Sequence, residues 1–183
     1  MRSLEPDARQ LVIRLMDDAG STLLLAMEPV SDRKFYAENA DGLSAAWVVG
    51  HLACVLDLAS SWFGKPRMCE RSFHAVFNET AATEVTVSKA SMVDPEKYPK
   101  ALLLLLFNRA VVKAIRALDE FDITEWDAPG PPGVPVSLRT GGAVWEFLAR
   151  HTDWHLGALS GSMPMFFGTF TLNIASHYFY DER

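Results

Sequence analysis

Two histidines one helical turn apart are the residues of this 183-residue chain best suited to chemistry. His151 and His155 stand in the run His-Thr-Asp-Trp-His, and residues four apart on a helix project from the same face. Two imidazoles on one face can bind a single metal ion. The pair alone is weak evidence for a metal, because two histidines at this spacing often lie on a helix partly buried and hydrogen-bonded, so a third ligand is needed to favour a metal.

His51 supplies that third candidate ligand, because it lies on the predicted inward face of an earlier helix and a bundle can bring it to the pair. Burying three imidazoles without partners would cost free energy, which favours a metal. Three neutral imidazoles leave coordination positions open, where a divalent ion would lower the pKa of bound water or thiol. The metal is expected to be Zn, Ni or Fe, since imidazole accepts several first-row ions.

Three further residues near these histidines are candidates for supporting roles. Asn108 falls on a predicted inward helix face, where either a polar cavity near the metal or a neighbouring helix or buried water would have to satisfy it. Trp47 and Trp154 flank the ligands, either as core residues or as aromatic surfaces that exclude water. Cys54 is interpreted as a small buried hydrophobe and not as a ligand.

The remaining acidic and histidine residues are expected to be solvent-exposed. Asp57, Glu146 and Asp153 could orient an imidazole or act as bases, but acidic residues on helices are usually solvated. His74 and His177 have no paired spacing and are expected on the surface or in loops. The sequence contains neither a serine-nucleophile elbow nor a phosphate-binding glycine-rich loop.

Capping residues, prolines and glycines divide the chain into four predicted helices, and no segment alternates like a strand. The first three helices are predicted at residues 4–27, 44–63 and 94–121, and the fourth follows Thr140-Gly141-Gly142 and reaches Gly161. Ser44 is expected to cap the second, and Asp94-Pro95 to begin the third. The long connection 65–93 suits a crossover, and the proline-rich segment 127–135 a semi-rigid loop.

The inward faces follow from helical spacing of apolar residues. In chain order they are Leu11, Leu15, Ala19, Thr22, Leu23 and Ala26; Trp47, His51, Val55, Leu58 and Trp62; Leu104, Asn108, Val111, Ile115 and Leu118; and Val144, Leu148, His151, His155, Ala158 and Leu159. The chain is therefore predicted to be all-α, a four-helix bundle in one domain over residues 1–183, with a core at 5–161 and an apolar C-terminal extension at 162–183.

Composition limits the partners and the compartment. The net charge is −6 and the basic residues are scattered, which disfavours nucleic acid. The longest strongly apolar run, 101–107, is shorter than the roughly 20 residues of a membrane span, and the start of the chain does not resemble a secretory signal. Two cysteines without a disulfide or metal-binding pattern suit the cytoplasm. The apolar extension leads us to expect a homodimer.

The chain resembles the DinB and YfiT-like superfamily of metal-dependent bundle proteins. The family motif Trp-x-x-x-His-Leu is matched at residues 47–52, and His-x-x-x-His-x-Gly at residues 151–157, in the same order and on the expected helices. The similarity extends through Asn108-Arg109 and the segment 119–129, and covers residues 5–161. It implies an up-down-down-up bundle with a long crossover between the second and third helices, and a divalent ion held by His51, His151 and His155.

Characterised relatives in that superfamily include S-transferases that use low-molecular-weight bacterial thiols and a mycothiol-dependent maleylpyruvate isomerase. The resemblance therefore implies a metalloenzyme that activates a thiol or water, a transferase or a hydrolase, with a small-molecule substrate and a low-molecular-weight thiol as co-substrate. The alternative is a non-catalytic bundle that dimerises or binds a partner, with structural histidines.

Overall fold

The computed structural model describes residues 8–40, 42–78, 88–132, 134 and 138–162. Regular structure within these ranges is helical, apart from one isolated bridge between Pro129 and Thr140. The elements are α1 (Ala8–Met27), α2 (Asp32–Phe35), α3 (Ala45–Trp62), α4 (Arg71–Phe77), η2 (Ala90–Met92), α5 (Lys100–Asp119), η3 (Ile123–Glu125) and α6 (Gly141–Ser162). The division into a core at 5–161 and an extension at 162–183 stays a prediction, because residues 1–7 and 163–183, with His177, lie outside the described residues.

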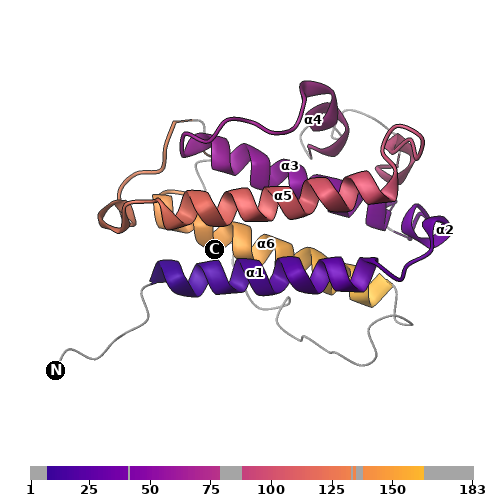
Figure 1. Ribbon diagram of the computed structural model, residues 1–183, viewed down its shortest axis with the longest axis horizontal. Helices are drawn as coiled ribbons and strands as arrows, with labels where there is room; N and C mark the ends of the chain where they lie inside the picture. Colours follow the sequence, from indigo (N-terminus) through magenta and orange to yellow (C-terminus); the bar gives the residue numbers. More distant parts are fainter. Residues whose placement is uncertain (1–7, 41, 79–87, 133, 135–137, 163–183) are drawn as a thin grey trace, which may run out of the picture.

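The four long helices form a bundle in which α1 and α6 run in one direction and α3 and α5 in the other (Figure 1). Helix α3 packs against α5 and α6, and α1 packs against the same two helices, so each long helix has two neighbours. The up-down-down-up, all-α architecture is thereby confirmed.

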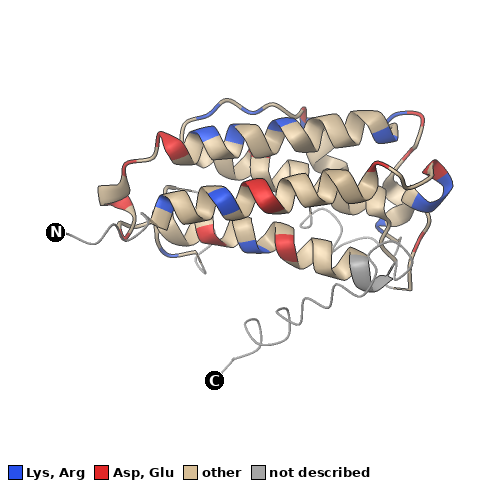
Figure 2. Ribbon diagram, turned by 60° about the horizontal axis from the view of Figure 1, so that its bottom comes forward, with Lys and Arg blue, Asp and Glu red and all other residues tan. Residues whose placement is uncertain are grey.

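Charged residues of both signs are spread along the outer faces of the helices (Figure 2). One of them ties two helices together: the Arg9 guanidinium near the start of α1 donates to the carbonyls of Asp119 and Phe121, both at 3.2 Å, at the end of α5. The apolar faces are left for the core, as expected for amphipathic bundle helices.

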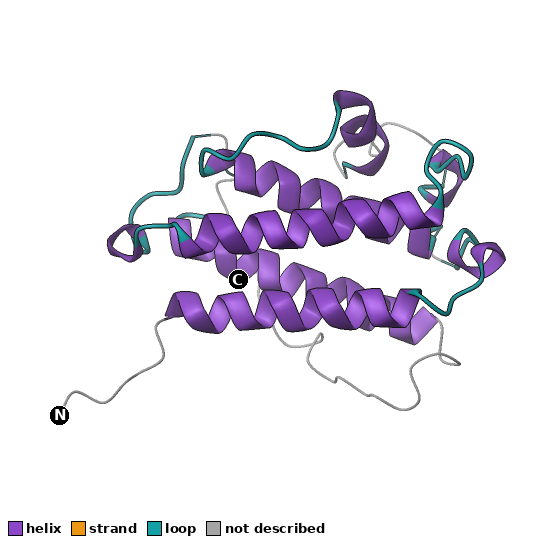
Figure 3. Ribbon diagram, in the orientation of Figure 1, coloured by secondary structure: helices purple, strands orange, loops and turns teal. Residues whose placement is uncertain are grey.

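The connection from α3 to α5 returns along the bundle because these helices run in the same direction (Figure 3). It carries two short helices, α4 and η2, which the sequence did not predict as separate elements. Helix α4 lies against α3, so part of this crossover covers the core helix. Residues 79–87 of the crossover lie outside the described residues.

Helix α3 is the central helix of the bundle. It begins where predicted, with the Ser44 hydroxyl accepting from the amide of Trp47 at 3.1 Å. It is also the one described helix long and apolar enough to cross a membrane, but 78% of that stretch is buried inside the bundle. Such burial is typical of a core helix in a soluble protein.

Helix α1 is rotated relative to its predicted inward face. Leu11 and Leu15 are 51% and 41% exposed, so their assignment to the core was wrong. Thr22 is exposed as well, whereas Ala19 and Leu23 are buried as predicted. Val12 and Met16 face the core in place of the two leucines, and Gly20 allows α1 to approach α5 closely: a Cβ there would lie 3.0 Å from Val111 Cγ1. The buried residues of α1 are Val12, Met16, Ala19, Gly20, Leu23 and Met27.

Helix α5 begins at Lys100, not at the predicted Asp94. Pro99 caps the helix, and a proline disfavours the helical conformation for the residue before it. The Asp94 carboxylate instead accepts from the amide of Glu96 at 2.9 Å in a preceding turn. The predicted cap thus stabilises a local turn that begins six residues before Lys100.

The inward face of α5 also differs from the prediction, and Asn108 is exposed. The run 102–106 consists of leucines, so apolar spacing alone allows several rotations of this helix. The observed rotation buries the larger Phe107 and turns Asn108 outward. Asn108 is therefore not a support of the predicted metal site. The buried residues of α5 are Leu103, Phe107, Ala110, Val111, Ala114, Ala117 and Leu118.

Candidate metal centre

Helices α3 and α6 bring three histidines together inside the bundle. A ring nitrogen from each of His51, His151 and His155 lies within 4.8 Å of the other two. His51 Nε2 is 3.1 Å from His151 Nε2, and the ring centroids of His151 and His155 are 4.6 Å apart. Residues 100 positions apart in sequence therefore converge on one point, as ligands of a single metal ion must.

The backbone carbonyl of Phe77, at the end of α4, sets the orientation of His51. His51 Nδ1 lies 2.9 Å from this oxygen, and a carbonyl can only accept, so Nδ1 carries the hydrogen. The lone pair then resides on Nε2, which faces His151. Trp47 stacks on the ring at 4.8 Å with an interplanar angle of 9°. Metal-binding histidines commonly donate their other ring N–H to a carbonyl or carboxylate in this manner.

His155 has a buried ring nitrogen that the described residues leave without a partner. The residue is 4% exposed and its Nε2 has no hydrogen bond within the described residues. Burial, followed by the neighbouring imidazoles of His151 and His51, lowers the pKa of His155 to about 2. The ring is therefore neutral. An unpaired buried polar atom costs about 1–3 kcal/mol, a cost that coordination to a metal would remove.

Aromatic rings surround the cluster. Trp154 meets His155 edge to face at 4.5 Å, and Phe147 lies 4.9 Å from His151. Trp47 is buried, whereas Trp154 is 44% exposed and His151 is half-buried. Both tryptophans thus contact ligand candidates, and the side of the cluster near His151 and Trp154 is the more accessible one.

A cation lies beside the buried tryptophan. Lys89 Nζ is 4.5 Å from the centroid of the Trp47 ring, a cation–π contact. Its charge is close enough to contribute to lowering the pKa of His155. Burial and this nearby charge both oppose protonation of the His155 ring, which keeps it in the neutral form that can bind a metal.

The lowered pKa of His155 predicts how the metal-free protein responds to acid. Between the ordinary histidine pKa of about 6.5 and the value near 2 in the folded state, the unfolded chain binds one more proton. The contribution of neutral His155 to the free energy of unfolding is thus fully present above pH 6.5. It is lost as the pH falls, by up to ~1.4 kcal/mol per pH unit. The free energy of unfolding, measured with urea, should decrease less between pH 7 and pH 5 for His155→Leu than for the parent. Equal losses would contradict the prediction.

Other candidates lie away from the cluster. Cys54, Asp57 and His74 form a separate buried group, so the expectations that Asp57 is solvated and that His74 lies on the surface or in a loop were wrong: they are 0% and 9% exposed. Glu146 and Asp153 are exposed, as predicted. A signal for Asp57 exists in the sequence, since it is the one charged residue of α3 and a charge on such an apolar helix must be paired. Ala158, assigned to the inward face of α6, is exposed as well.

Comparison with protein families identifies the fold. The sequence model described as the DinB superfamily matches residues 15–159, which include all three histidines. The chain belongs to the DinB superfamily. The match covers all of α3, the crossover and α5 of this DinB protein and most of α1 and α6, in agreement with its all-α bundle. Comparisons with curated proteins and with solved structures returned no significant match.

Proposed function

We propose that this DinB-superfamily protein is a metalloenzyme that holds Zn, Ni or Fe through His51, His151 and His155 and activates a thiol or a water. The single observation that carries the proposal is the buried Nε2 of His155, which has no hydrogen-bond partner among the described residues and lies beside two further imidazoles. A neutral His155 and an Nδ1-protonated His51 both offer a lone pair, which is the form that binds metal. The donor set therefore fits a divalent ion.

A divalent ion bound by three imidazoles supplies Lewis acidity and open coordination positions, which favours a thiolate or hydroxide near neutral pH. The protein's own residues define the surroundings. Phe77 holds the hydrogen of His51 on Nδ1, and Trp47 excludes water from one side of that ring. Lys89, on the Trp47 face, adds a positive charge that favours an anionic nucleophile.

The reaction class that we favour is transfer of a low-molecular-weight thiol to a small electrophile. A sulfur–carbon bond forms, the leaving group departs with its electron pair, and the thiol proton passes to solvent. Half-buried His151 and partly exposed Trp154 give the more accessible side for the two small substrates. Hydrolysis, with water in place of the thiol, uses the same arrangement.

The test combines metal analysis with turnover. Protein purified without an affinity tag and without added metal should contain close to one equivalent of metal by elemental analysis. It should conjugate cysteine or glutathione to 1-chloro-2,4-dinitrobenzene, or hydrolyse p-nitrophenyl acetate, and chelation should abolish the activity until metal is restored. Absence of metal even after reconstitution would overturn the proposal. Stoichiometric metal without any turnover would instead support the non-catalytic bundle.

We further propose a cytoplasmic homodimer. Cys54 and Cys69 are both buried free thiols, a state that suits a reducing compartment. The dimer is proposed from the apolar residues of the extension 162–183, of which 163–183 lie outside the described residues. Sedimentation equilibrium of the full chain should give twice the 20.3 kDa monomer mass, and a monomer mass would contradict the proposal.

A further inference from the structure

A row of residues along α3 contacts the short helix α4. At one end of the row, Trp47 Nε1 donates to the carbonyl of Val76 at 3.2 Å and His51 Nδ1 to that of Phe77 at 2.9 Å. Between these side chains, Gly50 allows close approach, because a Cβ there would lie 2.3 Å from ring carbons of Phe77. The last carbonyls of a helix have no partner within it, so side chains of α3 satisfy those of α4.

The other end of the row binds α4 through His74. The His74 Nε2 lies 3.3 Å from Asp57 Oδ2, and its Nδ1 lies 3.0 Å from Cys54 Sγ. A carboxylate can only accept, so Nε2 carries the hydrogen, and in the neutral ring Nδ1 then accepts from the thiol. Burial, followed by the nearby Cys69 and Asp57, raises the pKa of Cys54 to about 12, which keeps that thiol protonated as a donor. The ring of His74 is therefore held at both nitrogens.

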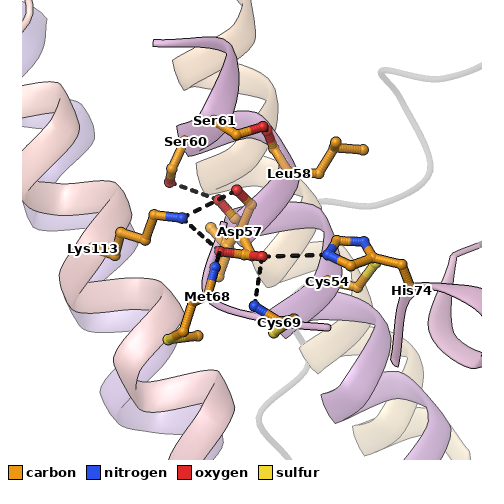
Figure 4. Close-up of polar contacts among 10 residues, drawn as sticks. Cys54, Asp57, Leu58, Ser60, Ser61, Met68, Cys69, His74 and Lys113 are labelled. Carbon is orange, nitrogen blue, oxygen red and sulfur yellow. Dashed lines mark hydrogen bonds and ion pairs between the residues drawn. The ribbon is translucent and has the colours of Figure 1, made fainter. Parts of the chain in front are cut away.

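Asp57 is the centre of this buried group (Figure 4). It is fully buried and accepts from the amides of Met68 and Cys69 at 2.8 and 3.0 Å, and from Lys113 Nζ at 2.5 Å. Burial alone would raise the pKa of Asp57, but the hydrogen bonds from His74, Lys113 and the two amides outweigh it and hold the pKa below its usual range. One charged carboxylate thus binds α5, the chain entering α4, and α4 itself.

We propose that His74, held by Asp57, is a positioning residue for the metal ligand His51. His74 and Phe77 are one turn apart on the same helix, so fixing the ring of His74 fixes where the Phe77 carbonyl lies. That carbonyl keeps the hydrogen of His51 on Nδ1, so the lone pair that can bind metal is on Nε2, the nitrogen that faces His151. If α4 shifts, the hydrogen can move to Nε2, where it blocks coordination. The inference rests on the proposed metal site.

The test measures cobalt binding by the full-length protein and by His74 variants. His74→Leu removes both contacts of the ring, and its affinity for Co²⁺ should fall about 10- to 100-fold, with altered visible absorption of the bound ion. His74→Gln retains a side-chain N–H toward Asp57 and should recover part of the affinity. Leu118 is a buried residue near the end of α5, so Leu118→Ala serves as a matched destabilised control and should bind Co²⁺ like the parent.

A second measurement separates this inference from the metal site itself. Long-range ¹H–¹⁵N spectra of the metal-free protein report which nitrogen of His51 is protonated. The parent and Leu118→Ala should show Nδ1–H, and His74→Leu should show a shift toward Nε2–H. Should His74→Leu fail to fold, Cys54→Ala, which removes only the thiol on His74 Nδ1, should produce the same shift to a smaller extent.

The outcomes are distinguishable. Parent-like cobalt affinity and an unchanged His51 tautomer in the folded variant would overturn the positioning role while leaving the metal site intact. If the parent binds no Co²⁺, the metal proposal fails, and the inference fails with it as a statement about a ligand. A tautomer shift together with weakened cobalt binding in His74→Leu but not in Leu118→Ala supports the inference.

Discussion

Replacing His151 with alanine is expected to remove stoichiometric metal while leaving the bundle folded. His151 is half-buried, so its truncation creates little cavity, but its Nε2 is one of the converging nitrogens, 3.1 Å from that of His51. Loss of partners that merely support a ligand costs roughly 10- to 100-fold in metal affinity, so loss of the ligand itself should cost more than about 100-fold. Elemental analysis after dialysis, with circular dichroism for helicity, measures both effects.

Glu146→Ala provides the matched control, because Glu146 is exposed on the same helix and has no part in the cluster. It should retain the parent's metal content and helicity. Full metal occupancy in His151→Ala would show that His151 is not a ligand. If the alanine variants of His51 and His155 also retained full metal, the proposed metal site would be wrong. Helix loss in His151→Ala alone would indicate a structural histidine.

Replacing Asp57 with asparagine is expected to destabilise the metal-free protein by about 3–5 kcal/mol, which is typical of breaking a buried ion pair by removing one partner. The carboxylate is fully buried and Lys113, with 16% of its side chain exposed, faces it at 2.5 Å. The variant would leave this ammonium group without its counter-charge. Urea unfolding at pH 7 gives the free-energy difference, and a loss below about 1 kcal/mol would contradict the buried ion pair.

Two controls separate the contribution of the Asp57–Lys113 ion pair from that of the other hydrogen bonds of Asp57. Lys113→Met in the Asp57→Asn background removes the unpaired charge and should recover part of the lost stability. Asp17→Asn, on the exposed face of α1, should change stability by less than about 0.5 kcal/mol. A double variant no more stable than Asp57→Asn would mean that the cost comes from the other hydrogen bonds of the carboxylate.

The effect of Asp57→Asn on the free energy of unfolding should depend on pH. Because the pKa of Asp57 is lowered in the folded state, its contribution is fully present above the unfolded value of about 3.9 and is lost as the pH falls through the folded value. The difference in unfolding free energy between the parent and Asp57→Asn should therefore stay constant from pH 7 to 5. It should narrow only below about pH 4.

Local features of the sequence predicted much of the fold. The start of α3 followed from Ser44, whose hydroxyl caps it, and the start of α6 from Thr140 and the glycines after it. The pairing of His151 with His155 followed from helix geometry alone, since residues four apart share a face. Such features depend on interactions within a few residues, and for that reason they are visible in the chain itself.

Rotation of the helices could not be predicted in the same way. Leu11, Leu15 and Asn108 were each placed one position from the residues that the bundle buries. On α1 and α5, adjacent apolar stripes satisfy the same spacing rule, so the pattern allows more than one inward face. Gly20 and Phe107 decide between them through contact with other helices, and that contact exists only after packing.

The sequence by itself determined the four long helices and named the three histidines, because capping and helical spacing are local. Only the tertiary structure decided that α4 lies on α3, that Asp57 and His74 are buried partners, and that Phe77 orients His51. These contacts join residues 17 and 26 positions apart and use a backbone carbonyl whose position no residue type records. Polar partners in a core are chosen by which groups meet when the helices pack, since each buried donor or acceptor must then be satisfied.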